Sequence, residues 1–392
     1  MLILASLLTL NGAARHGAHF LGGDDFGLSL ILLGLAVVAG FGALVAMRSA
    51  RAVEGPRARP RWYHWAILAA LLLFHCAVAH RYIRNRPVTI DCYVFQRDAA
   101  QTLLQGHNPF GTSHANPYDE NETRKNYARD SVVNGRVLEG MPYPPVNFLA
   151  AVPGYLAGDV RYGYVAAMLL SAIFVFAWMP DARGLWLGGF ALVSPLTFFV
   201  ERQCWTEPLM WAFLCLTFYV TARHPRWAPL AVGLFLATKQ YNVLALPFLG
   251  YFVQPFTWKA YGKLMALTLG VAGATVLPFA LWNFHALWHD LVQFHLGLPP
   301  RLDSISFAIP FPWATKLAAA LLLALTVWAA RRGSQPAANF AAVYGMAMLL
   351  FFLASTHALL NYYFFISQAF LLTAAALWPQ GQALTAKVRA IR

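Results

Sequence analysis

Two of the carboxylates in the one long polar interval of this chain, which runs from Ile90 to Asn147, have a spacing that could place them together. Asp91 and Asp98 are seven residues apart, so a helix would carry both on one face. Apolar and aromatic residues recur there with helical spacing, which predicts an amphipathic surface helix over 91–104 that ends near Gly106. Because a fixed carboxylate can take a proton from a hydroxyl group, Asp91 is a candidate general base. The Asp98 side chain could either contact a substrate or be a solvated surface charge, and its position in the sequence is compatible with both roles.

A second group of polar residues surrounds Lys239, in the segment TKQYN at 238–242. An ammonium between two short apolar runs is hard to justify unless it binds an anion such as a phosphate, although a lysine that reaches the lipid headgroups is an alternative. The corner ERQCWTEP at 201–208 carries charged and amide side chains that could orient Lys239, bind a sugar, or form structural ion pairs. The candidate binding residues from these segments and from the end of the polar interval are Tyr143, Glu201, Arg202, Gln203, Glu207, Gln240 and Tyr241.

Histidines form a third group. His285 and His289 are four residues apart, with Asp290 and His295 nearby, which permits a metal site on one helix face. The same segment is also typical of an interfacial helix rich in Trp and Phe, so we expect His289 to contact an acceptor or a lipid headgroup instead. His357, which opens the last apolar run, could bind a lipid phosphate or be an interfacial histidine without a ligand. Since no D-x-D motif or glycine-rich phosphate loop occurs, we expect no metal and no cofactor.

The composition is that of a polytopic membrane protein. Hydrophobic residues make up 59% of the 392 residues, charged residues make up 11%, and the mean hydropathy is +0.52, whereas charged residues are about a quarter of a soluble domain. The net charge of +13 comes from residues spread over short segments between apolar runs, which is the pattern that sets membrane orientation. This distribution favours contact with membrane lipids and argues against nucleic-acid binding.

The alternation of apolar runs and basic segments predicts a topology. The positive-inside rule places the basic segments at 48–61, 223–227, 258–263 and 331–333 and the C-terminal tail in the cytoplasm. The extracytoplasmic side then receives the long loop at 84–145, the 201–208 corner, TKQYN, the 283–311 loop and His357.

The predicted crossings follow from the same alternation. They are 26–47, 63–83, 162–178, 184–200, 205–222, 265–282, 312–330, 337–354 and 358–378, with 227–253 as two short helices that meet at 238–242. The segment 146–158 is too short to cross straight, so it is either a re-entrant half-helix or a crossing that replaces one of the next two. The expected total is about 10–12 spans.

Three short motifs in the first half of the chain resemble a known family. They are Asp91-Cys92-Tyr93 at the exit of a spanning helix, Ala99 to Phe110, and Tyr143-Pro144-Pro145 before the next apolar run. The arrangement resembles the integral-membrane glycosyltransferases of the GT-C superfamily, and within it the GT87 or DUF2029 group of polyprenyl-phosphate-dependent mannosyl- and arabinofuranosyltransferases. The corner SPLTFFVERQCWTEPLMW is similar to the family's pattern, but Arg202 replaces a glycine and Glu207 is displaced.

The resemblance implies an all-α GT-C-like bundle whose long extracytoplasmic first loop carries amphipathic helices. It divides the chain into an N-terminal extension at 1–61 with one extra transmembrane helix, a catalytic module at 62–256 and a C-terminal module at 257–392. The position of Asp91 matches the family's general base, and Lys239, Arg202 and His357 are expected to bind the donor phosphate.

The expected reaction is an inverting, metal-independent transfer of mannose or a pentose from a polyprenyl-phosphate donor. The acceptor would be a glycan, glycolipid or lipid at the outer face of a bacterial inner membrane. Because a lipid phosphate leaves without an acid catalyst, one base suffices.

Two other classes of protein remain as alternatives. A lipid-linked-sugar flippase or another polytopic transporter would be expected to carry charges near the middle of its helices and some repeat symmetry, whereas the charges here gather at one face. A non-catalytic subunit of a membrane complex fits the displaced Glu207, and it predicts that Asp91 can be changed without consequence.

Overall fold

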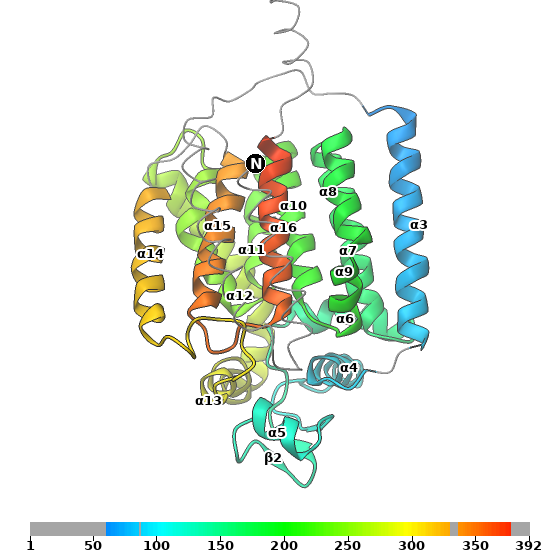
Figure 1. Ribbon diagram of the computed structural model, residues 1–392, viewed down its shortest axis with the longest axis vertical. Coiled ribbons are helices and arrows are strands. Elements are labelled where there is room, and N and C mark those ends of the chain that lie inside the picture. Colours follow the sequence, from blue (N-terminus) through cyan, green and yellow to red (C-terminus); the bar gives the residue numbers. More distant parts are fainter. Residues whose placement is uncertain (1–59, 86–87, 330–335, 378–392) are drawn as a thin grey trace, which may run out of the picture.

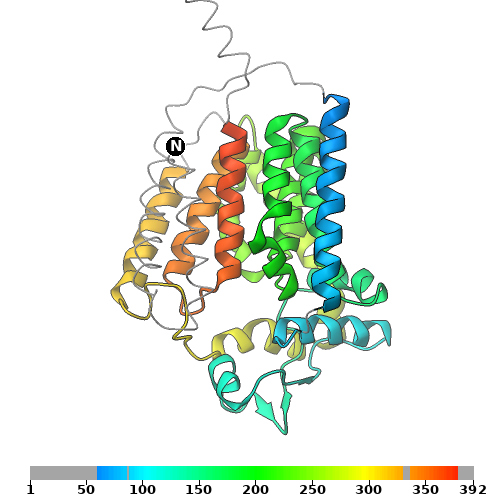
Figure 2. The same ribbon diagram turned by 45° about the vertical axis from the view of Figure 1, so that its right-hand side comes forward.

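The computed structural model describes residues 60–85, 88–329 and 336–377, and this part of the chain is mostly helical (Figure 1). Long helices run side by side as a bundle, and a cap of short helices and strands covers one end, at the bottom of the picture. Figure 2 shows α4 (Asp91–Leu104, cyan) and the yellow segment that ends in α13 (Phe294–Gly297) lying across this end. The predicted amphipathic helix over 91–104 is confirmed with the same bounds.

The other helices divide between the bundle and its cap. In chain order they are α3 (Trp62–Asn85), α5 (Glu120–Asn126), α6 (Val146–Leu156), α7 (Arg161–Trp178), α8 (Ala182–Val193), α9 (Pro195–Arg202), α10 (Glu207–Arg223), η2 (Pro225–Trp227), α11 (Ala228–Leu236), η3 (Gln240–Phe252), α12 (Trp258–Trp288), η4 (His289–Gln293), α14 (Trp313–Ala329), α15 (Pro336–Leu353) and α16 (Leu360–Leu377). The cap also holds a small antiparallel sheet in the order β1-β3-β2, formed by β1 (His114–Ala115), β3 (Arg136–Val137) and β2 (Val132–Val133).

The predicted fold class, an all-α polytopic membrane protein, is confirmed, while the count of about 10–12 spans was predicted for the whole chain and can be compared only over the described residues. Five of the described helices are long and apolar enough to cross a membrane, or six if the bent pair α8–α9 is one span. The predicted crossing at 26–47 and the N-terminal extension lie outside the described residues. Other predicted crossings form helices of 17 residues, such as α10 and α14, which are shorter than the roughly 20 residues that a straight span needs.

Two breaks in the helices fall where the sequence predicted them, whereas the bend of 52° between α8 and α9 lies inside the crossing predicted at 184–200. The segment 146–158 forms the 11-residue α6 with Pro153 inside it, which confirms a half-helix. A Cβ atom on Gly154 would lie 2.6 Å from the Gly163 nitrogen, so α6 packs directly against α7. The predicted pair of short helices within 227–253 is also confirmed, because α11 ends at Leu236 and η3 begins at Gln240.

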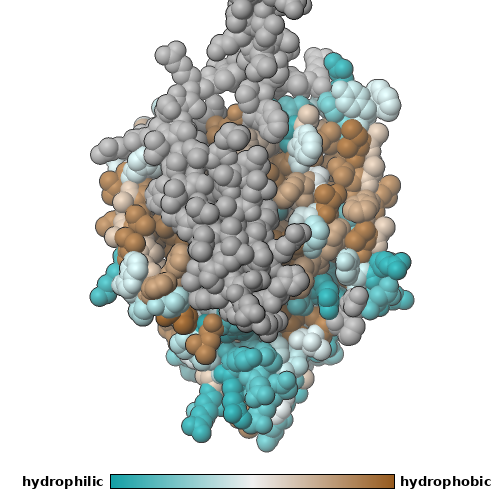
Figure 3. Space-filling view, viewed as in Figure 1, coloured by the Kyte–Doolittle hydropathy of each residue, from teal (hydrophilic) through white to brown (hydrophobic). Residues whose placement is uncertain are grey.

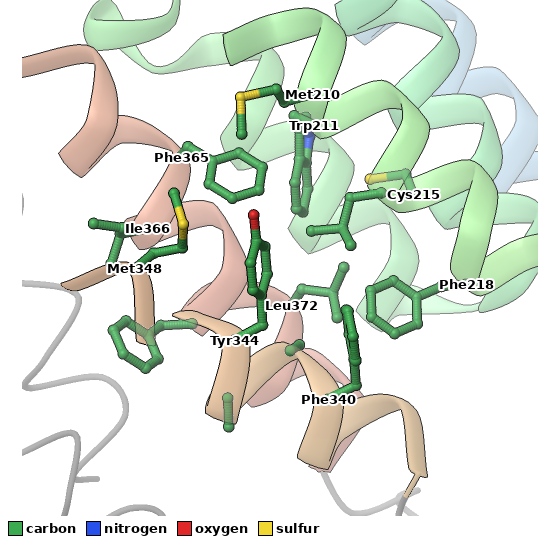
Figure 4. Close-up of a cluster of buried hydrophobic side chains, with 14 of the residues drawn as sticks. Met210, Trp211, Cys215, Phe218, Phe340, Tyr344, Met348, Phe365, Ile366 and Leu372 are labelled. Carbon is green, nitrogen blue, oxygen red and sulfur yellow. The ribbon is translucent and has the colours of Figure 1, made fainter. Parts of the chain in front are cut away.

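The core of the bundle lies where α15 and α16 pack against α10, and it consists of large apolar side chains (Figure 4). Nearly every residue of α15 is buried, as expected for a helix that is apolar on all sides. A hydrogen bond of 2.8 Å from the Tyr344 hydroxyl to Asn242 Oδ1 ties this core to η3. In Figure 3 the visible sides of the bundle are largely hydrophobic and the cap is hydrophilic, so the polar chemistry is concentrated at one end.

Candidate functional site

Asp91 is the first residue of α4, and neighbouring groups hold its carboxylate. Asp91 Oδ1 accepts a hydrogen bond from the Cys92 N–H at 2.7 Å, and Oδ2 accepts one from the Tyr127 hydroxyl at 3.2 Å. The Asp91 N–H donates to the Tyr118 hydroxyl oxygen at 3.2 Å. Asp91 is only partly buried, so its carboxylate is oriented while still being accessible to a substrate.

The groups around Asp91 keep their protons at neutral pH. Burial, followed by the negative charge of Asp91, raises the pKa of Tyr118 and of Tyr127 above the usual value for tyrosine. The same two causes raise the pKa of the Cys92 thiol. The two hydroxyls and the thiol are therefore neutral groups that do not compete with Asp91 as bases.

Lys239 lies at the break between α11 and η3, where it is buried with 6% of its surface exposed. Its Nζ donates to Thr206 Oγ1 and to Glu207 Oε1, the latter at 3.4 Å, and lies 4.4 Å from the centre of the Tyr143 ring. Glu207 Oε1 also accepts a hydrogen bond of 3.0 Å from the Tyr241 hydroxyl. An ammonium has three donors, and two of those of Lys239 bond to Thr206 and Glu207.

Tyr143 connects Lys239 to the helix that carries Asp91. Its hydroxyl lies 2.9 Å from Cys92 Sγ, while its ring faces the Lys239 ammonium. Asp91 and Lys239 therefore belong to one cluster of contacts at the capped end of the bundle. Beside them, the Gln240 amide donates to the Pro142 carbonyl at 2.9 Å, which fixes the start of α6 against the α11–η3 break.

Sequence reasoning missed Arg301, which lies in the loop before α14. Its guanidinium forms a two-pronged ion pair with Asp303, at 2.7 and 2.6 Å, and donates to the Asn126 side chain at the end of α5. Its charge is within electrostatic reach of Asp91. A signal existed, because Arg301 is the one Lys or Arg between residues 283 and 311.

His357 lies next to this arginine. The Arg301 N–H donates to the Thr356 carbonyl at 3.2 Å, and the His357 Nδ1 is 3.1 Å from Thr356 Oγ1. Burial lowers the pKa of His357 below the usual value. His357 Nε2 is buried and meets no geometric hydrogen-bond criterion among the described residues, although the Pro299 backbone lies close enough to oppose the lowering of the pKa of His357.

The residues predicted at the 201–208 corner separate. Glu207 joins the Lys239 cluster, but Glu201 faces α3, where its Oε1 lies 2.8 Å from His75 Nε2. Arg202 and Gln203 are partly buried at the end of α9. The Arg202 Nε atom has no partner in the part of the chain that the structure describes.

Asp98 and His289 make contacts within the cap. The Asp98 carboxylate pairs with Arg97 at 2.7 Å and with His114 at 3.1 Å, which joins α4 to β1. His289 Nδ1 lies 3.1 Å from the carboxylate of the fully buried Asp290. The other oxygen of Asp290 accepts the N–H groups of Gly111 and Met141, at 2.8 and 3.1 Å. These contacts hold the cap together.

A comparison with solved structures identifies a similar fold. The chain is similar to ArnT from Cupriavidus metallidurans, whose crystal structure was determined bound to undecaprenyl phosphate. The TM-score is 0.53 at 16% sequence identity, and the alignment covers 84% of this chain and 63% of ArnT. This chain therefore spans less than two thirds of the length of ArnT. No family model matches the chain, and no curated protein is similar to it in sequence.

Proposed function

We propose that this protein is a membrane glycosyltransferase of the GT-C type that transfers a sugar from a polyprenyl-phosphate donor to a hydroxyl acceptor. The observation that carries the proposal is the joining of Asp91 to Lys239 through Cys92 and Tyr143 at one end of an apolar bundle. The similarity to the fold of ArnT, which binds undecaprenyl phosphate, supports a lipid-linked donor. The transferred sugar is mannose or a pentose, as the resemblance to the GT87 group implies.

In the proposed reaction Asp91 is the general base. Its carboxylate takes the proton of the acceptor hydroxyl while the acceptor oxygen forms a bond to the anomeric carbon of the sugar. The bond between that carbon and the lipid-phosphate oxygen breaks on the opposite face, and the electron pair leaves with the phosphate, so the anomeric configuration inverts. The proton stays on Asp91 until it is released to water, and no metal is needed in this mechanism.

Lys239 stabilises the departing phosphate in this proposal. Negative charge on the leaving oxygen increases in the transition state, and a positive group fixed beside it lowers the barrier. Glu207 and the Tyr143 ring hold the ammonium in place, while Arg202 and His357 supply further donors for the phosphate. Asp98, Gln203, Gln240, Tyr241 and His289 remain candidates for substrate contact, whereas Glu201 is buried against His75 and does not face the cluster of Asp91 and Lys239.

The site is expected to work at the outer face of a bacterial inner membrane. The basic segments at 223–227 and 258–263 lie at the opposite ends of their helices from the cap. The positive-inside rule therefore supports an extracytoplasmic cap, where a glycan, glycolipid or lipid acceptor would be available.

The proposal is tested by replacing the base. Membranes that contain the full chain are incubated with radiolabelled polyprenyl-phosphate mannose, arabinose or glucose, and transfer of the label from the lipid is measured. Asp91→Asn is expected to fold normally and to lower transfer by about 10³-fold, within the range for removal of a general base. The exposed loop residue Asp130 provides the matched control, since Asp130→Asn is expected to transfer at the wild-type rate.

Three outcomes contradict the proposal. Wild-type activity of Asp91→Asn excludes Asp91 as the base. No transfer by the wild-type chain with any of the three donors argues for a non-catalytic subunit. Label that crosses the bilayer while it stays on the lipid argues for a transporter.

A further inference from the structure

A segment of the cap folds back over Asp91 and brings Tyr127 to its carboxylate. Tyr127 follows the last residue of α5, and only 2% of its surface is exposed. Its ring packs against Tyr118 and Phe294, with ring centres 5.9 and 6.4 Å apart. The hydroxyl is thereby directed to Asp91 Oδ2 at 3.2 Å. A buried tyrosine places its hydroxyl where a partner exists, and here the partner is the proposed base.

The segment that carries Tyr127 is anchored at both ends. At its start the Asp119 side chain accepts the Glu122 N–H and caps α5. At its end the Arg301 guanidinium donates a hydrogen bond to the side chain of Asn126, the residue that directly precedes Tyr127. The Tyr127 hydroxyl is therefore held in position by the loop and by a cation from a distant part of the chain.

We infer that Tyr127 is a positioning residue for the catalytic carboxylate, and that it holds Asp91 in the orientation needed to accept a proton from the acceptor. The inference rests on the proposed function of Asp91. Each carboxylate oxygen has two lone pairs, and Tyr127 and the Cys92 N–H occupy one on each oxygen. The Tyr118 hydroxyl also lies within hydrogen-bonding reach of the Asp91 carboxylate, which is only partly buried and so remains accessible to the acceptor hydroxyl.

The contact has a consequence for the dependence of the rate on pH. A donor that bonds to the ionised carboxylate stabilises its negative charge, and Tyr127→Phe removes one such donor from Asp91. Burial raises the pKa of Tyr118, Tyr127, Tyr143 and Cys92, and Arg301 stays charged, so these neighbours do not titrate in the acidic range. The titratable and charged groups that face Asp91 from the surrounding elements are Cys92, Tyr118, Tyr127, Tyr143 and Arg301.

The test is Tyr127→Phe, which keeps the buried ring and removes only the hydroxyl. Because this hydrogen bond is made to a charged group, its loss is expected to move the acidic limb of the kcat/KM profile upward by about one pH unit. We expect kcat to fall about tenfold, with KM for the radiolabelled polyprenyl-phosphate sugar within about twofold of wild type. Tyr155→Phe is the matched control, because Tyr155 packs with the Val146 and Val160 cluster at the end of α6.

A second measurement does not depend on activity. The carboxylate band of Asp91 is obtained by infrared titration as the difference between the wild-type chain and Asp91→Asn, and the same difference is recorded in the Tyr127→Phe background. An upward shift of about one pH unit supports the inference. An unmoved band together with an unmoved acidic limb overturns it, and a lower rate alone would then reflect a structural role. If Asp91→Asn is fully active, the proposed function fails, whereas the infrared result still decides whether Tyr127 controls Asp91.

Discussion

Glu201 and Glu207 are six residues apart and both are buried, yet they belong to different networks. Glu207 pairs with Lys239 and accepts a hydrogen bond from Tyr241, so it is part of the cluster that reaches Asp91. Glu201 pairs with His75, whose other ring nitrogen lies 2.8 Å from the Leu192 carbonyl. That second network joins α3 to α8 and α9 within the bundle.

The difference follows from where each residue falls in its helix. Glu207 begins α10, where the positive end of the helix dipole favours a carboxylate. Glu201 lies in the last turn of α9, where the dipole is unfavourable and a donor such as His75 is needed. Between them the chain reverses at Cys204, whose φ of +56° is left-handed. Glu201 and Glu207 lie in similar sequence surroundings, but the structure brings Glu201 to α3 and Glu207 to Lys239.

The first prediction removes the cation from the Glu207 network. Lys239→Met is expected to lower kcat/KM for the polyprenyl-phosphate donor by about 10²–10³-fold, because a fixed positive group beside the leaving phosphate is lost. The radiolabel assay measures this effect, and Lys263→Met, an exposed residue of α12, is the control. If Lys239 only balances the buried Glu207, the double variant Lys239→Met/Glu207→Gln should recover wild-type transfer, which would remove the phosphate role.

The second prediction addresses the Glu201 network. Glu201→Ala is expected to lower the free energy of unfolding by about 2 kcal/mol, because one buried nitrogen of His75 is left without a partner. Glu201→Gln is expected to cost less than about 1 kcal/mol, since its side-chain carbonyl oxygen can accept the N–H of the same nitrogen. Thermal unfolding in detergent measures both variants, with donor transfer at a permissive temperature as the second readout. A loss of kcat in folded Glu201→Gln would show that this network also serves the reaction.

The helices could largely be predicted from the sequence, because an apolar run carries a local signal of length and composition. The bounds of α4, the half-helix α6 and the break before Lys239 all follow from such local patterns. The alternation of basic segments also predicted that Asp91 and Lys239 share one end of the bundle.

The contacts of the site could be predicted only in part, because they join residues that are distant in sequence. His75 and Glu201 are separated by 126 positions, and no periodicity connects them. Tyr118 and Tyr127 lie in a polar loop without a repeating pattern, and their role depends on how that loop folds back. Arg301 bonds to Asn126 of α5 across 175 positions of sequence, so this contact has no local signal either.

The third prediction concerns the cap itself, where the expected effect is smallest. Burial opposes ionisation of Asp98, but hydrogen bonds from His114 and Arg97 outweigh it, so the pKa of this carboxyl lies below its usual value. A lowered pKa in the folded state stabilises the cap above the unfolded pKa of about 3.9, and this contribution disappears as the pH falls through the folded pKa. Cleavage of the cap by pepsin should therefore accelerate about fivefold when the pH is lowered from 4.5 to below the folded pKa of Asp98. A fivefold change corresponds to a loss of roughly 1 kcal/mol in the stability of the cap, which is the size expected for a partly exposed ion pair. Asp98→Asn is expected to be cleaved faster at pH 4.5 with little further pH dependence, whereas Asp130→Asn should behave as wild type. An equal response of all three chains to acid would mean that Asp98 does not anchor α4 to β1.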